Sequence, residues 1–450
     1  MNARYRMTRA SRLLPLVLAA AILAGVTGNA VAADFKTGEM VDKGSWQKAE
    51  GLLPPEILRH YKEGEYANKF VDWPVASTIV PPDFKAASDA NEGKFTTSPE
   101  GTILDKATGK QPTYIMGYPF PTIDEKDPAA AVKILWNCFY RSWYYGDILA
   151  ESQVDWLSAT ALERRADVRA AFGYYDGVPR EELPATNPEN FLYRQLALVT
   201  APTDLNGTAA LTWRYRDPGK RDSTWAYVPA LRRVRATSPA NRSDGFLGSD
   251  ISQDDGQFFD GKVEDFVWTL VGQTDQLRLS EETNLKGEAK GVWRGDQGWD
   301  TEWPDRPFIG YMDSNWKGIA WAPTAAASLS LRRHWIIEGV PRDKYYLFGK
   351  IQLYIDAVSY QGAWNRKFGW TGDLVAIHQV MAWNPLPFTR PDGKVDYNQG
   401  SNQAYQTVEN VKLNRATVGG IKANPKAGFF LRGKMDPALY EYNTLTRAGK

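Results

Sequence analysis

Polar and apolar residues alternate through the middle of the chain, a pattern that is typical of half-buried β-strands. Residues 211–216 alternate in this way, and residues 223–228 repeat the pattern after an Asp-Pro-Gly turn. The Asn206–Gly207 pair just before them is a strong hairpin signal. Further strands are predicted at 263–271, 345–360 and 373–383. The pattern therefore predicts a series of neighbouring antiparallel strands within residues 189–431.

The predicted sheet contains on the order of ten strands, which is near the limit for an open sheet, so it must curl or close. Trp213 and Tyr215 point to one face of their strand, and Arg214 and Arg216 point to the other. We therefore predict a mainly β (α+β) fold, with a large curved antiparallel sheet or incomplete β-barrel whose concave face is aromatic and whose outer face is solvated. A sheet whose apolar face is simply covered by helices agrees with the alternation equally well.

The segments that flank this sheet are predicted to be less regular. Residues 34–188 are rich in Pro, Gly and charged residues over most of their length, and we interpret them as an N-terminal wrapping arm with short helices. One helix is predicted at 127–150, because Asp127 is a good N-cap and Pro128 suits the first helical position. Residues 432–450 are predicted to form a polar C-terminal tail with a short helix.

Residues 1–33 have the order of a secretory signal peptide. Four arginines precede an apolar run at 13–26, and small residues follow, ending at Ala33. The apolar run is short for a membrane span. We therefore expect cleavage and export to the periplasm, with an uncleaved N-terminal anchor as the alternative.

Composition excludes several classes of protein and site. The 54 basic and 53 acidic residues give a net charge of +1, which argues against a nucleic-acid-binding protein. Cys138 is the only cysteine, so an intramolecular disulfide or a cysteine-rich zinc site cannot form. Neither a Gly-x-Ser-x-Gly nor a His-Glu-x-x-His motif is present. We therefore predict no catalytic residues, no metal and no cofactor. The unusual feature is the aromatic content, with 17 Trp, 22 Tyr and 18 Phe.

Three stretches of sequence resemble a known family. They are residues 117–121 followed by 133–137, residues 227–235 followed by 246–255, and residues 353–356. Together they resemble the exported bacterial proteins grouped as domain-of-unknown-function family 1329, which is similar in fold to the outer-membrane lipoprotein-sorting carriers. The resemblance spans roughly residues 40 to 445. It implies a half-barrel of this type over 189–431, helices and a lid on the concave face, and a hydrophobic cavity that holds acyl chains in the carriers.

The aromatic strands are the main candidate for a ligand-binding wall. An apolar cavity takes a lipid chain out of water with a gain of about 0.8 kcal/mol for each buried methylene group. The side chains predicted to line such a cavity are Trp213, Tyr215, Trp225 and Tyr227. The alternative is that these four residues are buried core.

Residues 246–259 are interpreted as a mobile cover. Glycines flank and interrupt the segment and provide hinges. Its apolar underside is predicted to consist of Phe246, Leu247, Phe258 and Phe259. The alternative is an ordinary surface loop in which a polar residue caps a short helix.

Charged residues on both sides of this segment are candidates for head-group or metal binding. Arg232, with Arg233 and Arg235, suits bidentate binding of an anionic head group, or pairing with nearby acids. The acids Asp250, Asp254, Asp255 and Asp260 do not follow the helix-loop-helix calcium pattern, so we interpret them as solvated loop carboxylates.

These observations predict a periplasmic carrier or accessory protein that binds a lipid or other hydrophobic molecule and does not carry out covalent chemistry. The expected partners are the ligand, an envelope transporter or outer-membrane protein, and a transient membrane surface. One alternative is an exported carbohydrate-binding protein or glycoside-acting enzyme that uses the Trp-rich loops at 291–325. A second alternative is a structural interaction module of an envelope transport system.

Overall fold

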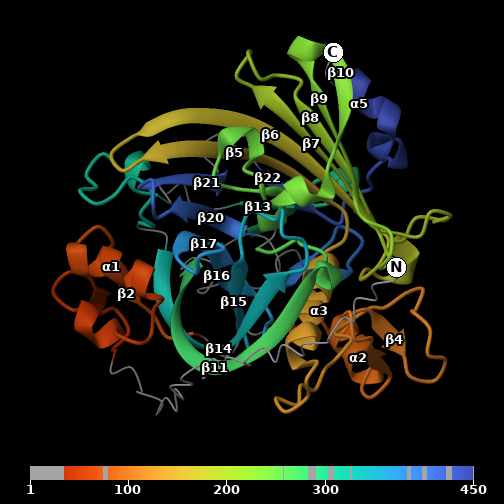
Figure 1. Ribbon diagram of the computed structural model, residues 1–450, viewed down its shortest axis with the longest axis horizontal. Helices are drawn as coiled ribbons and strands as arrows, with labels where there is room; N and C mark the ends of the chain where they lie inside the picture. The colour runs from red at the N-terminus through yellow and green to blue at the C-terminus, as the bar shows by residue number, and fades with distance from the viewer. Residues whose placement is uncertain are drawn as a thin grey trace, which may run out of the picture. The chain divides into compact units, whose positions relative to one another are not determined.

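One large, curved and mostly antiparallel β-sheet forms the fold (Figure 1). The computed structural model describes residues 35–73, 80–256, 258–281, 290–302, 309–324, 327–382, 387–397, 403–421 and 428–448. Within these ranges, 18 strands belong to the sheet. The predicted signal peptide lies outside the described residues. The prediction of a mainly β fold with a large curved sheet is confirmed, although the sheet has more strands than expected.

Two series of consecutive strands make up most of this sheet. The first series comprises β5 (Ile148–Ser158), β6 (Leu162–Tyr174), β7 (Phe191–Ala201), β8 (Ala209–Tyr215), β9 (Ser223–Val228) and β10 (Arg233–Thr237). The second series comprises β11 (Phe266–Glu281), β14 (Ala327–Pro341), β15 (Lys350–Asp356), β16 (Gly362–Phe368), β17 (Leu374–Ala382), β20 (Gln403–Asn410) and β21 (Arg415–Ile421). Strand β21 pairs with β5 and so joins the two series.

Shorter strands complete the described structure. The sheet also includes β1 (Met40–Val41), β2 (Asn68–Phe70), β12 (Lys290–Trp293), β13 (Trp299–Glu302) and β22 (Gly428–Leu431). Two separate pairs are formed by β3 (Phe95–Thr97) with β4 (Ile103–Asp105), and by β18 (Pro387–Thr389) with β19 (Val395–Tyr397).

The sheet begins earlier in the chain than predicted. Strands β5 and β6 belong to it, although both lie in the segment interpreted as a wrapping arm. The first residues of β5, from Ile148 to Ala150, are all buried. A strand that is buried on both faces lacks the polar alternation on which the prediction depended.

The helices lie in the N-terminal arm and at the C-terminal end. Within the described residues, the α-helices are α1 (Pro55–Glu63), α2 (Pro82–Ala90), α3 (Ala130–Trp143) and α5 (Tyr442–Ala448). Helix α3 begins close to the predicted position but ends at Trp143, so the prediction of a helix up to residue 150 is wrong. Its N-cap is Ala129 and not Asp127, although Asp127 Oδ1 accepts a hydrogen bond from the Ala129 N–H at 2.8 Å. Nearly all of its side chains are buried, in a core formed with β11 and β14. None of the helices in the described part of the chain is long and apolar enough to cross a membrane.

A buried histidine joins α1 to the sheet. His60 Nδ1 lies 2.6 Å from a Glu65 carboxylate oxygen, and His60 Nε2 lies 2.7 Å from a carboxylate oxygen of Glu409 on β20. Burial by itself lowers the pKa of His60, but the hydrogen bonds to the two carboxylates outweigh this effect and raise it. Protonation of the imidazole therefore strengthens the contact between the N-terminal arm and the strands.

Candidate ligand-binding pocket

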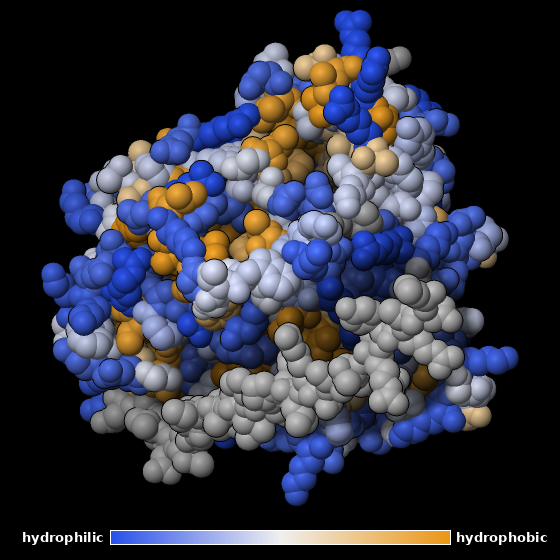
Figure 2. Space-filling model, in the orientation of Figure 1, coloured by the Kyte–Doolittle hydropathy of each residue, from blue (hydrophilic) through white to orange (hydrophobic). Residues whose placement is uncertain are grey.

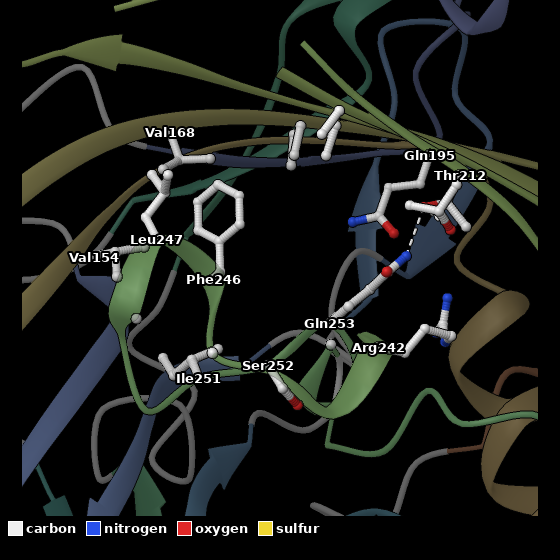
Figure 3. Close-up of a pocket in the computed structure, with 18 of the residues that line it drawn as sticks. Val154, Val168, Gln195, Thr212, Arg242, Phe246, Leu247, Ile251, Ser252 and Gln253 are labelled. Atoms are coloured by element: carbon white, nitrogen blue, oxygen red, sulfur yellow. Dashed lines mark hydrogen bonds between the residues drawn. The ribbon is translucent and has the colours of Figure 1, made fainter. Parts of the chain in front are cut away.

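A pocket lies between the strands β5 to β9 and the segment that follows β10. Its cavity volume is about 490 Å³. We call residues 241–256 the lid segment. The cavity between this segment and the strands is called the lid pocket. The face of the strands that borders the cavity is called the inner face. Figure 3 shows the lid segment crossing below these strands, and Figure 2 shows hydrophobic side chains gathered on this side of the molecule.

A row of alanines forms the centre of the inner face. Cross-strand partners follow one another in register over five strands: Ala150 on β5, Ala170 on β6, Ala197 on β7, Ala210 on β8 and Ala226 on β9. All five residues line the lid pocket. A methyl side chain leaves most of the space above a strand unfilled, so this alanine row is the reason that a cavity exists here.

A second row runs beside the alanine row and becomes more polar along its length. Its members are also register partners and also line the lid pocket, in the order Ile148, Phe172, Gln195, Thr212, Thr224 and Thr237. Because side chains two positions apart share one face of a strand, the two rows are parallel. The inner face is therefore apolar near β5 and β6 and polar near β8 to β10.

The lid segment matches this division between apolar and polar ends. Phe246, Leu247 and Ile251 lie at the apolar end, opposite Val154 and Val168 (Figure 3). At the other end, the Gln253 side-chain amide donates a hydrogen bond to Thr212 Oγ1, and Arg242 and Ser252 also line the cavity. The lid pocket can therefore take an amphipathic molecule, with its apolar part under Phe246 and its polar part near Gln253.

Buried ion pairs fix the polar end of the lid segment. Asp255 accepts hydrogen bonds from the N–H and the hydroxyl of Ser252, both at 2.8 Å. It also pairs with Lys367, and His378 Nδ1 lies 3.4 Å away. Burial alone would raise the pKa of Asp255, but the two basic neighbours outweigh this effect and lower it. The carboxylate is therefore ionised and holds the lid segment on β16 and β17.

The apolar end of the lid segment rests on the pocket with a tightly turned backbone. Leu247 has a φ of 52°, in the left-handed region that side chains rarely adopt. The next residue, Gly248, has a φ of 78°, and a Cβ at this position would meet no atom within 4 Å. Asp250 connects this end to the sheet, because its N–H donates to Thr417 Oγ1 at 2.9 Å and its carboxylate pairs with Arg415 at 3.1 Å.

Comparison with known proteins identifies the family. A family model described as "Protein of unknown function (DUF1329)" matches residues 41–291. The chain belongs to this family. The resemblance noted from the sequence is thereby confirmed.

Several solved structures are similar to this DUF1329 member. They include a DUF1329 family protein from Desulfovibrio piger, with 14% identity over 71% of this chain and 100% of that chain and a TM-score of 0.45. A putative outer membrane lipoprotein-sorting protein domain from Vibrio parahaemolyticus shares 14% identity over 70% of this chain and 97% of its own, with a TM-score of 0.44. A LolA superfamily protein from Nitrosomonas europaea shares 10% identity over 70% and 98%, with a TM-score of 0.38. Among curated proteins, the search finds no match.

The structure places the four predicted wall aromatics away from the lid pocket. Trp213 Nε1 donates to the Tyr440 carbonyl at 2.8 Å, and the Trp225 and Tyr442 rings are 5.7 Å apart. Tyr227 belongs to the same cluster, and Tyr215 packs against Phe191. Helix α5 lies against β8 to β10, and the preceding turn (Pro437–Tyr440) lies against β7 (Figure 1). Tyr215 and Tyr227 are buried, and Trp213 and Trp225 are half-buried, so their packing corresponds to the alternative of core residues.

The prediction that Arg214 and Arg216 point to a solvated outer face is wrong. Arg214 is buried and pairs with Asp222 at 2.7 Å, and Arg216 is buried and pairs with Asp176. Arg214 shares its face with Ala210 and Thr212, so it lies on the inner face and not on a solvated outer face. Buried guanidinium groups need carboxylate partners, and the aspartates supply them here.

The remaining predicted site residues divide between the lid pocket, the core and the surface. Phe246 and Leu247 line the lid pocket. Phe258 and Phe259 are buried in the core around α3, where Phe259 stacks on Phe139 at 6.3 Å. Arg232 is exposed at the turn between β9 and β10, with a φ of 47°, and does not line the lid pocket.

The acidic residues at 250–260 pair with basic residues other than Arg232, Arg233 and Arg235, which the sequence had suggested. Asp254 pairs with Arg242 at 2.7 Å, and Asp260 lies 3.3 Å from Arg214. Over the described ranges, the structure contains no cluster of three His, Cys, Asp or Glu side chains arranged to hold a metal ion. Asp254 and Asp255 are buried structural carboxylates, and the interpretation as solvated loop groups is wrong for them.

Two of the tryptophans at 291–325 are packed inside the protein. Trp299 and Trp321 are among the largest fully buried side chains, and Trp293 and Trp316 are half-buried. Trp303 lies outside the described residues. A carbohydrate platform needs exposed rings, which Trp299 and Trp321 do not provide.

Proposed function

We propose that this protein is a periplasmic carrier, or an accessory protein of envelope transport, that binds a lipid or other hydrophobic molecule in the lid pocket without making or breaking bonds. The observation that carries the proposal is the alanine row, because it keeps a cavity open beneath a lid whose underside is apolar. A volume of about 490 Å³ is within the range of about 300–1,000 Å³ that small-molecule sites occupy.

The free energy available in the lid pocket is sufficient for binding an acyl chain. Burial of about ten methylene groups gains roughly 8 kcal/mol before the costs of ordering the chain. The polar ends of Gln195, Thr212 and Gln253 would orient a head group at one side of the cavity. The proposed ligand is therefore amphipathic, with one apolar chain and one polar end.

Export and transfer complete the proposal. The order of charged, apolar and small residues at 1–33 supports secretion into the periplasm. Phe246 and Leu247 would have to move off the cavity for a ligand to enter, while the pair between Asp255 and Lys367 holds the other end of the lid segment. Hand-over would then take place to an envelope transporter, an outer-membrane protein or a membrane surface.

The test is mass spectrometry of the protein isolated without detergent. We expect native spectra to show a bound species that dissociates on activation, and an organic extract of the same sample to contain a lipid or other hydrophobic molecule. The matched sample is the Ala197→Trp variant, in which the cavity is filled and the bound species should be absent. Folded wild-type protein that carries no bound molecule, and that binds no fluorescent fatty acid in titration, contradicts the proposal.

A further inference from the structure

A second cavity lies beside the lid pocket. Its volume is about 470 Å³, and Arg242 lines both cavities. The walls come from four separate parts of the chain: Arg221 before β9, Arg242 and Asp254 of the lid segment, Lys262 to Phe266 before and at the start of β11, and Pro341 to Tyr346 after β14. We call this cavity the basic pocket.

Positive charge is in excess in the basic pocket. Five basic side chains line it, against three acidic ones. Asp254 is already bound by Arg242 and by the Tyr346 hydroxyl at 2.8 Å, and Asp343 lies 3.5 Å from Arg221. Burial raises the pKa of Asp265, the third acid, and likewise lowers the pKa of Lys262, so these two groups do not decide the balance of charge. Among residues with described placement, Arg342 and Lys344 have no carboxylate partner, so the cavity holds uncompensated positive charge.

Arg242 presents a buried donor between the two cavities. Its side chain is only 5% exposed, its Nε binds Asp254 and its Nη2 binds Asp260. Its Nη1 lies 3.1 Å from an Asp222 oxygen but makes no hydrogen bond within the described structure. The contact with Asp222 is an ion pair without hydrogen-bond geometry, so Nη1 still has N–H groups for which a hydrogen-bond acceptor would lower the free energy. An anionic ligand oxygen would supply that acceptor.

We propose that the basic pocket is an oxyanion site that takes a phosphate group. Arginine and lysine side chains form short, charge-assisted hydrogen bonds with phosphate oxygens, and Arg221, Arg242, Arg342 and Lys344 all line this one cavity. The phosphate is either the head group of the amphiphile in the lid pocket or a free phosphate. The head-group source rests on the proposed function, because it requires a lipid in the lid pocket. The free-phosphate source does not.

The experiment compares three probes by calorimetric titration at constant ionic strength. The probes are inorganic phosphate, oleoyl lysophosphatidic acid, and mono-oleoylglycerol, which has the same acyl chain and glycerol but a hydroxyl in place of the phosphate. Lipids are kept below their aggregation concentrations. The test variant, Arg221→Gln with Lys344→Gln, removes two exposed charges from the basic pocket. The control variant, Arg333→Gln with Lys317→Gln, also removes one exposed ion-paired arginine and one exposed lysine, and neither residue lines the lid pocket or the basic pocket.

The head-group source predicts that the phosphate-bearing lipid binds about tenfold or more tightly than the neutral lipid, as expected for one or two charge-assisted hydrogen bonds. The test variant should remove most of this preference and leave the affinity for the neutral lipid unchanged, and the control variant should behave as the wild type does. In the Ala197→Trp variant, both lipids should bind weakly while inorganic phosphate binding stays the same.

The other outcomes separate this inference from the proposed function. If inorganic phosphate binds and the test variant weakens it, but neither lipid binds, the oxyanion site is supported with free phosphate as its source, and the carrier proposal fails. If the two lipids bind equally well and inorganic phosphate does not bind, the oxyanion site is refuted and the carrier proposal stands. Equal losses of phosphate binding in the test and control variants also refute it, because they indicate only a general effect of net charge.

Discussion

Replacement of Ala197 by Trp tests the alanine row directly. Ala197 lies between Ala170 and Ala210 in neighbouring strands, and it is only partly buried because the cavity lies above it. An indole at this position projects into the cavity of about 490 Å³ and takes the space that a ligand chain would fill. The expected result is a folded protein with much weaker ligand binding.

The size of the effect follows from the methylene groups that the indole displaces. Exclusion of about four methylene groups costs about 3 kcal/mol, which is roughly a 200-fold increase in Kd. The added side chain enters open space, so we expect the free energy of unfolding to change by less than about 1 kcal/mol. Overpacking a filled core would instead cost about 1–3 kcal/mol.

The assay is a fluorescence titration with a dansyl-labelled fatty acid, together with urea unfolding of the same samples. Ala161→Trp is the matched control, because Ala161 is exposed in the turn between β5 and β6 and does not line the lid pocket. A folded Ala197→Trp protein that binds the probe with wild-type affinity would refute the assignment of the cavity. A large loss of stability would show instead that the space above the alanine row is filled.

Four further predictions concern the lid segment, the outer face and the N-terminal arm. Phe246→Ser removes apolar surface over the lid pocket and should raise the Kd of the same fatty acid about tenfold, which is about 1.4 kcal/mol; an unchanged Kd would count against a covering role. Asp255→Asn leaves the Lys367 ammonium group buried without its carboxylate and should lower the free energy of unfolding by about 3–5 kcal/mol in urea titrations. Adding Lys367→Met should restore part of that loss, and a loss below about 1 kcal/mol would contradict the anchoring role. Trp213→Ala should lower the free energy of unfolding by about 2–3 kcal/mol, less than for a fully buried Trp, and leave the fatty-acid Kd unchanged. An unchanged free energy of unfolding together with a raised Kd would show instead that Trp213 lines the binding site. For His60, the raised pKa means that its contribution to stability is complete below the unfolded pKa of about 6.5 and is lost as the pH rises through the folded value. The difference in free energy of unfolding between wild type and His60→Gln should therefore shrink from pH 6 to pH 9, and a constant difference would show that His60 is not protonated in the folded protein.

The sequence was sufficient to predict the fold class and one half of the lid. The alternation at 211–216 and 223–228 corresponds to β8 and β9, and the hairpin signal at Asn206–Gly207 lies between β7 and β8. The alternation predicts these strands because successive side chains point to opposite faces of a sheet, and the two faces lie in different environments. Phe246 and Leu247 were also recognisable, since two large apolar residues between glycines have no packing partner within their own segment.

The sequence did not reveal which face of the strands borders the cavity. The alternation predicts large aromatic residues on the ligand wall, but Trp213 and Trp225 instead pack under α5, which lies more than two hundred residues later in the chain. The signal that could have located the inner face is one alanine on each of five strands, joined by threonines at alternate positions of β8 and β9. No single strand shows that signal clearly, because the row exists only when the register aligns Ala150, Ala197 and Ala226.

The amino-acid sequence alone therefore determined that the chain forms a large curved sheet with an apolar loop near its middle. Only the tertiary structure decided where the cavity lies and which charges surround it. The physical reason is that a face covered by another element must be filled to normal packing density, and large side chains do this. A face that leaves space for a ligand needs small side chains, and whether a face is covered depends on contacts between distant segments of the chain.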